Sequence, residues 1–257
     1  MPASLLPLKG GRNLRDMGGL TARDGRRLRH GHLFRSGSLH ELDPASIAAL
    51  KEMGLRTICD FRAPDERAEQ PTPSLGDQTE ILEWEDAQEL THRGLAEGET
   101  STRDDGRRAI LRVYEQLPVL HIAKYRTMFA RLMDGYVPLL FHCAAGKDRT
   151  GVAAALILIA LDIPRDAILE DYAASERLVE YLDLYRGDAA RNPESVIARY
   201  LQKPEPFVSA VLASHPDYLA HSLDLIAGRW GSVDDYLEQE MGVNAAGRQR
   251  LCDLLLE

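Results

Sequence analysis

Short apolar runs alternate with longer amphipathic segments over the first half of the chain. Residues 138–141, Pro-Leu-Leu-Phe, predict a short buried strand, and the small apolar residues at 151–161 predict a buried helix directly after it. Residues 55–60 predict a second strand. Residues 80–84 have the weaker pattern of a third strand, within an otherwise acidic and polar stretch.

The N-terminal segment has a different pattern. Residues 12–39 are punctuated by Gly18-Gly19, Asp24-Gly25 and Gly31, which predicts hairpins and loops. The segment is also rich in arginine, and we expect most of these side chains to form a solvated basic face.

Helix ends give clear signals. Asp43 and Pro44 are typical of a first helical turn, and Gly54 is typical of a helix end. We expect a helix over residues 102–116 and another that opens at Pro118 and runs to about residue 133. Beyond residue 161 we expect only helices, with starts predicted at Pro164, Pro193, Pro206, Pro216, Ser232 and Asn244.

Composition and charge narrow the class of protein. The chain has 257 residues, 44% of them hydrophobic, which suffices for one large domain or two small ones. Its net charge of -9 argues against nucleic acid as a general partner. Residues 1–11 lack the features of a signal peptide, and the apolar run 152–161 is about half of what spans a bilayer. We expect a cytoplasmic protein without integral membrane association, although secretion by a signal-less route stays open.

Three widely spaced cysteines, Cys59, Cys143 and Cys252, form neither a disulfide framework nor a zinc-binding pattern. A reducing compartment follows, and we expect no metal and no cofactor. Cys59 is expected to be a buried core residue, although oxidative pairing with Cys143 is an alternative.

The sequence HCAAGKDRTG at residues 142–151 is the strongest chemical signal. Cys143 ends a predicted strand and Arg149 opens a predicted helix, so the N–H groups between them can point at one anion. The same field favours thiolate over thiol and makes Cys143 a nucleophile near neutral pH. Arg149 offers a planar fork that matches two phosphoryl oxygens. The predicted phosphate-binding residues are Ala144, Ala145, Gly146, Lys147, Asp148 and Arg149.

Two other interpretations of this stretch are weaker. One is that Cys143 is a core cysteine and Arg149 a surface charge whose spacing arose by chance. A strand before the stretch, a helix after it and Gly146 inside it argue against this interpretation. A nucleotide-binding loop would need glycine at Phe141 and a hydroxyl at Asp148, so that motif is not met.

The stretch resembles the signature of the cysteine-dependent protein tyrosine phosphatases, in particular a bacterial branch with HCxAGKDRTG that accepts phosphotyrosine, phosphoserine/threonine and phosphoinositides. Residues 13–36 are similar to the opening of that family, and Asp60, Arg62 and Glu66 match a further family loop, with Phe61 for the usual leucine. Residues 171–175 and 231–237 resemble its C-terminal half.

The resemblance implies a fold and an organisation. We expect a single tyrosine-phosphatase-like α/β domain over residues 1–257, with a central sheet of four or five mostly parallel strands flanked by helices and a mainly helical C-terminal half. A helical lid within residues 172–205 is an expectation from the relatives, and an ordinary solvated helix pair is the alternative.

It also implies roles for single residues. Cys143 would form a cysteinyl-phosphate, Arg149 would stabilise its oxygens, and Asp148 would be the general acid, with Asp60, Asp104 and Asp105 next in line. An acidic helix N-terminus is the preferred interpretation of Asp104 and Asp105. We expect Lys147 to add positive charge at the mouth of the site. The predicted supporting residues are His142, Thr150, Asp60 and Arg62, where Thr150 would donate a hydrogen bond to the sulfur.

The expected partners are a phosphorylated protein or a phosphoinositide substrate, with phosphate, sulfate or vanadate as ligands of the same site. Two alternatives stay open. One is a catalytically weak module that binds phosphorylated ligands, and the other is a phosphatase for inositol phosphates or other small phosphate esters.

Overall fold

A five-stranded sheet lies at the centre of the computed structural model, which describes residues 5–85, 102–193, 198 and 201–257. One edge strand runs antiparallel to its neighbour, and the other three pairs of neighbouring strands are parallel. This confirms the expected α/β class with mostly parallel strands. In order across the sheet, the strands are β1 (Arg15–Asp16), β2 (Leu33–Ser36), β5 (Leu139–His142), β3 (Thr57–Asp60) and β4 (Glu80–Leu82).

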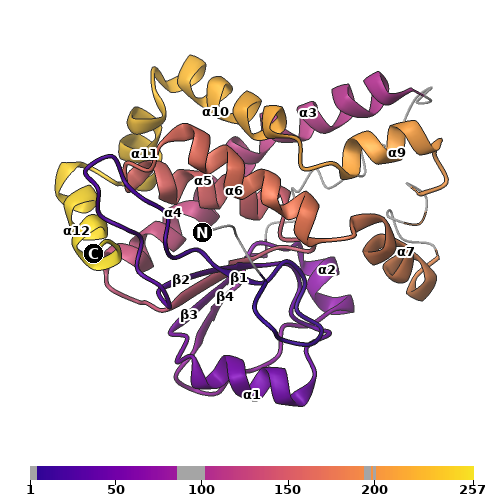
Figure 1. Cartoon of the computed structure of the whole chain (residues 1–257), viewed down its shortest axis with the longest axis horizontal. Helices are drawn as coiled ribbons and strands as arrows, with labels where there is room; N and C mark the ends of the chain where they lie inside the picture. The colour runs from indigo at the N-terminus through magenta and orange to yellow at the C-terminus, as the bar shows by residue number, and fades with distance from the viewer. Residues whose placement is uncertain (1–4, 86–101, 194–197, 199–200) are drawn as a thin grey trace.

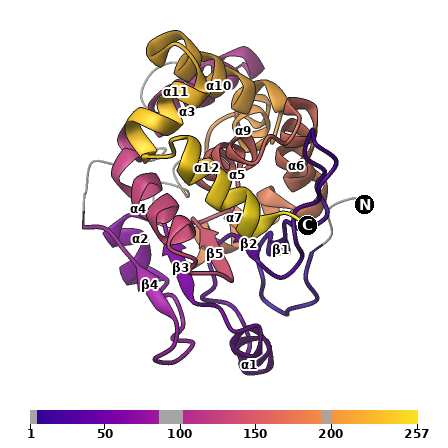
Figure 2. The ribbon, with the colours of Figure 1, turned by 90° about the vertical axis from the view of Figure 1, so that its left-hand side faces the viewer.

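Helices cover both faces of the sheet (Figures 1 and 2). α1 (Pro44–Glu52) lies against one face, and a thick helical layer covers the other. The helices of that layer include α4 (Ile122–Met133), α5 (Asp148–Ala160), α6 (Arg165–Leu178), α10 (Pro216–Trp230), α11 (Val233–Met241) and α12 (Ala245–Leu255). The remaining helices are α2 (Pro64–Glu69), α3 (Arg103–Leu120), α7 (Tyr181–Arg191) and α9 (Glu205–Leu212).

Successive residues of the central strand feed two separate hydrophobic clusters. Leu139 and Phe141 of β5 belong to the larger cluster under the helical layer, and Leu140 belongs to the smaller cluster beside α1. Side chains alternate between the faces of a sheet, so a strand covered on both faces needs apolar residues at every position. This explains why residues 138–141 form a continuous apolar run and not an alternating one.

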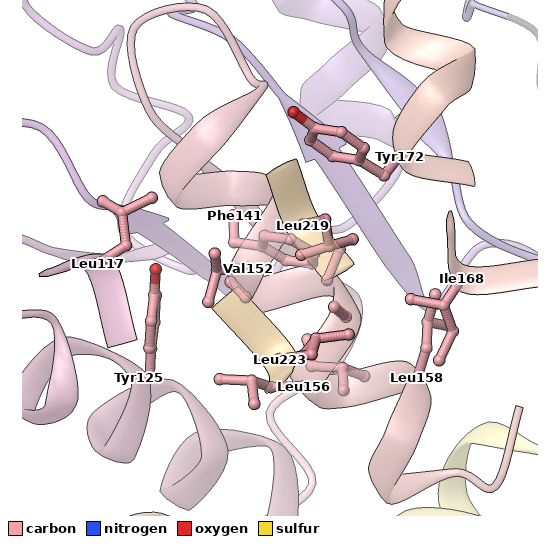
Figure 3. Packing of buried hydrophobic residues seen from close by; sticks show 14 of the residues in the cluster. Leu117, Tyr125, Phe141, Val152, Leu156, Leu158, Ile168, Tyr172, Leu219 and Leu223 are labelled. Carbon is pink, nitrogen blue, oxygen red and sulfur yellow. The ribbon is translucent and has the colours of Figure 1, made fainter. Parts of the chain in front are cut away.

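α5 is the most deeply buried helix of the larger cluster. Figure 3 shows Val152 and Leu156 of α5 beside Leu219 and Leu223 of α10, all of them at most 1% exposed. Full burial of one such side chain stabilises the fold by about 1.5–3 kcal/mol. The helix that begins at Asp148 is therefore held by its packing, and its N-terminus has a fixed place at the end of β5.

Most predicted helix ends are confirmed. The Asp43 side chain accepts a hydrogen bond from Ser46 N, and Gly54 follows α1 with a φ of 66°. Ser232 and Asn244 cap α11 and α12 through their side chains. Pro193 lies in a turn, and residues 194–197, where the predicted helix would begin, lie outside the described residues.

Pro118 does not open a helix, and that prediction is wrong. It lies inside α3, and the chain breaks only at His121, before α4. Proline within a helix leaves the carbonyl four residues earlier without its donor. Here the Tyr114 carbonyl oxygen accepts a hydrogen bond from Ser222 Oγ of α10 at 2.9 Å, so a neighbouring helix replaces the lost bond.

The arginines of residues 12–39 divide into two groups. Those at 23, 26, 27 and 29 are partly or fully exposed, as expected, but Arg12, Arg15 and Arg35 are at most 6% exposed. Asp171 of α6 lies between two of them, with Oδ1 3.3 Å from Arg15 Nε and Oδ2 2.6 Å from Arg35 Nη1. For these three, the predicted solvated face is wrong. α6 brings the buried carboxylate of Asp171 to Arg15 and Arg35, and Arg12 pairs with Glu41 and Asp188.

We predict that Asp171→Asn destabilises the fold by about 3–5 kcal/mol, because two buried guanidinium groups lose their carboxylate. The free energy of unfolding can be measured by urea denaturation at pH 7. Asp166→Asn, at an exposed position of the same helix, is the control and should change stability by less than about 0.5 kcal/mol.

The destabilisation caused by Asp171→Asn should depend on pH. Burial alone would raise the pKa of Asp171, but Arg15 and Arg35 outweigh burial and lower it. Stability from such a group is present above its unfolded-state pKa and is lost as the pH falls through the lowered folded-state pKa. The difference in free energy of unfolding between wild type and Asp171→Asn should therefore become smaller in acid. Equal stability of the two proteins at pH 7 would contradict the stabilising role of Asp171.

Candidate active site

Cys143 follows β5 directly, at the carboxyl end of the central strand, and is 2% exposed. Its Sγ accepts the predicted hydrogen bond from Thr150 Oγ1, at 3.1 Å. The loop 143–147 leads from this thiol into α5, whose first residue is Asp148. The first N–H groups of a helix lack intrahelical acceptors and lie at its positive end.

The carbonyl oxygens of this loop are held from outside. Ala144 O accepts a hydrogen bond from Ser38 N at 2.8 Å, and Gly146 O accepts from Asn13 Nδ2 at 2.9 Å and from Arg35 Nη2 at 3.0 Å. In contrast, the backbone N–H groups of residues 144–148 donate to no acceptor in the part of the chain that the structure describes. Buried N–H groups seldom stay unpaired in proteins, so this set of donors suits an anion.

Two glycines allow the loop to rest on the end of β2. Gly146 has a φ of 69°, and a Cβ atom there would lie 2.5 Å from Gly37 N. A Cβ atom on Gly37 would in turn lie 2.9 Å from Ala144 O. Larger residues at either position would push the loop away from the donors that hold it.

Arg149 is held by Glu66, at the N-terminal end of α2. Its Nη1 and Nη2 donate to the two carboxylate oxygens at 2.6 and 2.9 Å. Glu66 Oε2 also accepts a hydrogen bond from Ala63 N at 2.8 Å. Burial alone would raise the pKa of Glu66, but Arg149 outweighs it and lowers the pKa to about 2. The carboxylate is therefore ionised near pH 7 and orients the guanidinium, which has five N–H donors in all.

Asp60 and Arg62 form an ion pair at the end of β3, with Arg62 Nη2 2.6 Å from Asp60 Oδ2. Burial alone would raise the pKa of Asp60, but His142 and Arg62 outweigh it and hold the pKa well below its usual range. Arg62 Nη1 also donates to Ser38 Oγ at 2.8 Å, and the backbone of Ser38 holds Ala144. The pair therefore reaches the phosphate loop through Ser38.

His142 lies beside this pair and is fully buried, with Nε2 3.5 Å from Asp60 Oδ2 and 3.4 Å from Thr72 Oγ1. Burial lowers the pKa of His142 to about 4, although Asp60 opposes the shift. The imidazole is therefore neutral near pH 7, and its contact with Asp60 is a polar contact between a neutral and a charged group.

Asp148 is 7% exposed, and its Oδ1 accepts a hydrogen bond from Tyr114 Oη of α3 at 2.8 Å. Tyr114 Oη lies 2.6 Å from Tyr172 Oη of α6. Burial and the charge of Asp148 raise the pKa of Tyr114 well above its ordinary value. The carboxyl group thus has a fixed orientation, set by two helices that are distant in sequence.

The prediction that Lys147 adds charge at the mouth is wrong, because its side chain is 1% exposed. Its ammonium donates to the carbonyl oxygens of Val211, Leu212 and Ala213 at 2.8, 3.1 and 3.2 Å, at the C-terminal end of α9. The negative end of a helix dipole attracts a cation there, and the ammonium also lies 3.4 Å from Asp148 Oδ1.

Other predicted residues have structural roles. Asp105 forms a capping box with Thr102, and Asp104 lies beside it in the first turn of α3, which confirms their interpretation as a helix N-terminus. Cys59, Cys143 and Cys252 are all free thiols, and burial raises the pKa of Cys59 far above its ordinary value.

Among the residues described, no cluster of His, Cys, Asp or Glu is arranged to hold a metal ion. Within the same residues, no helix has the length and apolar character needed to cross a membrane.

Sequence reasoning missed several contacts. Asn13 and Arg35 stood in a segment that matched the phosphatase family, but nothing in the sequence linked them to Gly146. Glu66 matched a position of the family, but the sequence did not indicate Arg149 as its partner, and it gave no sign of the contact between Tyr114 and Asp148. The helical spacing of Tyr114 shows that it faces the core, but not that its hydroxyl meets a carboxylate.

Comparisons with known proteins agree with the motif. A model of the tyrosine phosphatase family matches residues 6–257. A protein of Cupriavidus necator named as a tyrosine-protein phosphatase is 34% identical over 244 residues, which are 91% of this chain and 83% of the relative. The triple specificity protein phosphatase PtpB of Mycobacterium tuberculosis is 30% identical over 261 residues, covering 89% of this chain and 92% of PtpB.

Among solved structures, the crystal structure of P. aeruginosa TpbA is similar at 20% sequence identity, with a TM-score of 0.32, over 68% of this chain and 88% of TpbA. The family match and the two relatives confirm the family indicated by HCAAGKDRTG. The chain therefore belongs to the tyrosine phosphatase family of enzymes.

Proposed function

We propose that this enzyme hydrolyses phosphate monoesters, phosphotyrosine among them, through a cysteinyl-phosphate intermediate. One observation carries the proposal. A thiol stands at the start of a loop whose N–H groups at 144–148 donate to no acceptor among the described residues, while Glu66 orients the adjacent Arg149. Such an arrangement binds a tetrahedral oxyanion with its central atom next to sulfur.

The reaction has two steps. In the first, the Cys143 thiolate attacks phosphorus, an S–P bond forms, the ester P–O bond breaks, and Asp148 gives its proton to the leaving oxygen. In the second, water attacks phosphorus, Asp148 takes the proton from that water, the S–P bond breaks and inorganic phosphate leaves. The loop N–H groups and Arg149 stabilise the charge on the three equatorial oxygens in both steps.

His142, Thr150, Asp60 and Arg62 support this chemistry without touching the substrate. Thr150 donates to the sulfur and so stabilises the thiolate released in the second step. Arg62, ionised together with Asp60, fixes Ser38 beneath the loop.

The substrate range follows from the relatives and from Lys147. A relative named as a triple specificity protein phosphatase supports a substrate range wider than phosphotyrosine. The bacterial branch that HCAAGKDRTG resembles suggests phosphoserine/threonine and phosphoinositides as the further substrates. The buried ammonium of Lys147 gives no support to binding of a second phosphate at the mouth of the site. We therefore propose phosphotyrosine as the main substrate.

The alternatives are a weakly active binding module and a phosphatase for small esters. Turnover of a panel of phosphopeptides, inositol phosphates and para-nitrophenyl phosphate, with vanadate as inhibitor, separates them from the proposed function.

We also propose that α7 is the lid over this site. Tyr185 of α7 is buried, and burial together with the negative groups of Asp148 and Cys143 raises the pKa of its phenol well above the ordinary value. Polar contacts near the C-terminal end of α7 hold the helix down. Asp188 accepts from Arg12 Nη1 and Nη2 at 3.0 Å each, and Asn192 Nδ2, just after α7, donates to Glu69 Oε1 at 2.9 Å.

Replacing Cys143 by Ser should lower turnover of para-nitrophenyl phosphate by more than about a thousand-fold while binding of inorganic phosphate persists, because only the nucleophile is lost. Arg149→Lys should lose about a hundred-fold or more, since a point charge cannot make the bidentate contact. Steady-state kinetics and calorimetric titration with phosphate measure the two properties. Cys252→Ser is the control for removal of a thiol, and wild-type activity in Cys143→Ser would refute the scheme.

Asp148→Asn should affect poor leaving groups far more than good ones, because only a poor leaving group needs the proton. We expect kcat for phenyl phosphate to fall by about 10²-fold or more, and kcat for para-nitrophenyl phosphate to fall much less. Asp104→Asn and Asp105→Asn, on the first turn of α3, are the matched controls. A normal rate with phenyl phosphate in Asp148→Asn, and a reduced rate in one of the controls, would assign the acid elsewhere.

Asp188→Asn should loosen α7 and expose the thiol. We expect alkylation of Cys143 by iodoacetamide, followed by mass spectrometry of the peptide, to become several times faster than in wild type. Asp183→Asn changes an exposed carboxylate of the same helix and should have no effect. Equal alkylation rates in all three proteins would show that α7 does not cover the site.

A further inference from the structure

The two oxygens of the Asp148 carboxyl group have different surroundings. Oδ1 accepts from Tyr114 Oη at 2.8 Å and lies 3.4 Å from Lys147 Nζ. Over the residues for which the structure gives positions, Oδ2 has no hydrogen-bond partner. Donors on one oxygen favour the form of the carboxyl group in which that oxygen carries no proton.

Burial determines which hydroxyl of the Tyr114–Tyr172 pair donates the hydrogen bond and which accepts it. Tyr114 and Tyr172 are at most 1% exposed, and burial with the charge of Asp148 raises the pKa of both phenols well above the ordinary value, so both stay protonated. A carboxylate can only accept hydrogen bonds, so Tyr114 uses its single O–H group to donate a hydrogen bond to Asp148 Oδ1. Tyr172 must then be the donor in the 2.6 Å contact with Tyr114. The hydrogen bonds run from Tyr172 through Tyr114 to Asp148.

Packing holds this chain of hydroxyls in place. The Tyr114 and Tyr172 rings meet edge to face, with centroids 6.1 Å apart. Gly151 admits the second ring, because a Cβ atom there would lie 2.9 Å from Tyr172 Cδ2. Figure 3 shows Tyr172 at the border of the hydrophobic cluster, with its hydroxyl directed away from Leu158 and Ile168.

We infer that Tyr114 and Tyr172 are positioning residues for proton transfer, which hold Oδ1 of Asp148 so that Oδ2 carries the proton given to the leaving group. This inference rests on the proposed function, in which Asp148 is the general acid. In addition, the two oxygens of Asp148 have different roles, and Tyr114 and Tyr172 impose this difference.

Loss of the Tyr114 hydroxyl should change the pH dependence of activity. Other titratable groups that interact with Asp148 are Lys147 in the loop and Tyr181 and Tyr185 of α7. All of them remain when Tyr114 becomes phenylalanine. Loss of the donor makes the carboxylate form less stable, so the carboxyl group holds its proton to higher pH. Since the acid must be protonated to act, the alkaline limb of the activity profile should move up.

The test is the pH dependence of kcat/KM for phenyl phosphate. In Tyr114→Phe we expect the alkaline limb to move up by about one pH unit, and in Tyr172→Phe by less in the same direction. Tyr236→Phe is the matched control, because it removes a buried hydroxyl that donates to Pro118 O at 2.6 Å, away from Asp148. Its profile should equal that of wild type. Tyr172→Phe keeps the test decisive if Tyr114→Phe fails to fold.

Asp148→Asn in the same series separates two kinds of failure. If its profile keeps the alkaline limb, Asp148 is not the acid, and both the proposed acid role and this inference are overturned. If the limb is lost in Asp148→Asn but stays in place in Tyr114→Phe and Tyr172→Phe, this inference alone is overturned. An equal shift in Tyr236→Phe would also overturn it, because the shift would then be a general response to a lost hydroxyl.

Discussion

The structure depends on one constraint in the loop after β5. A loop can present its N–H groups to an anion only if its carbonyl oxygens turn the other way, into the protein, and buried carbonyl oxygens need donors. Ala144 O and Gly146 O find theirs in Ser38, Asn13 and Arg35, which all precede the loop by more than a hundred residues. The N-terminal segment is therefore part of the site, although none of its side chains is proposed to touch the substrate.

A second set of contacts joins the helical C-terminal half to the same loop. Asp171 of α6 neutralises Arg35, whose guanidinium holds Gly146, and the end of α9 accepts the ammonium of Lys147. Tyr114 of α3 donates to Asp148, and Tyr172 of α6 reaches Asp148 through Tyr114. Each contact is buried, so each strongly affects stability and each restricts the loop to one conformation. The sheet supplies the position of the thiol, and the helices supply the orientation of the groups around it.

The sequence predicted the parts of this protein that depend on local chemistry. Residues 138–141 and 151–161 indicated the strand and the helix around Cys143, and Asp43, Ser232 and Asn244 indicated the starts of three other helices. Both kinds of signal could be recognised because periodicity and capping act over a few residues. Long-range pairing was not predictable. Lys147 was expected at the mouth because alternate residues of the loop were expected to face outward, but the C-terminal end of α9, more than sixty residues later, offers three carbonyl oxygens. Pro118 was expected to open a new helix, but it lies inside α3, where Ser222 of α10 donates to the Tyr114 carbonyl oxygen that the proline leaves without its helical donor.

The central claim is that the Cys143 sulfur receives the phosphoryl group within the cradle of N–H groups. The most direct measurement is a rapid acid quench of the enzyme during turnover of an aryl phosphate, followed by digestion and mass spectrometry. The account predicts one added phosphoryl group on the peptide that contains Cys143, and its disappearance when the substrate is exhausted. A phosphoryl group on a histidine or aspartate peptide during turnover, with Cys143 unmodified, would contradict it.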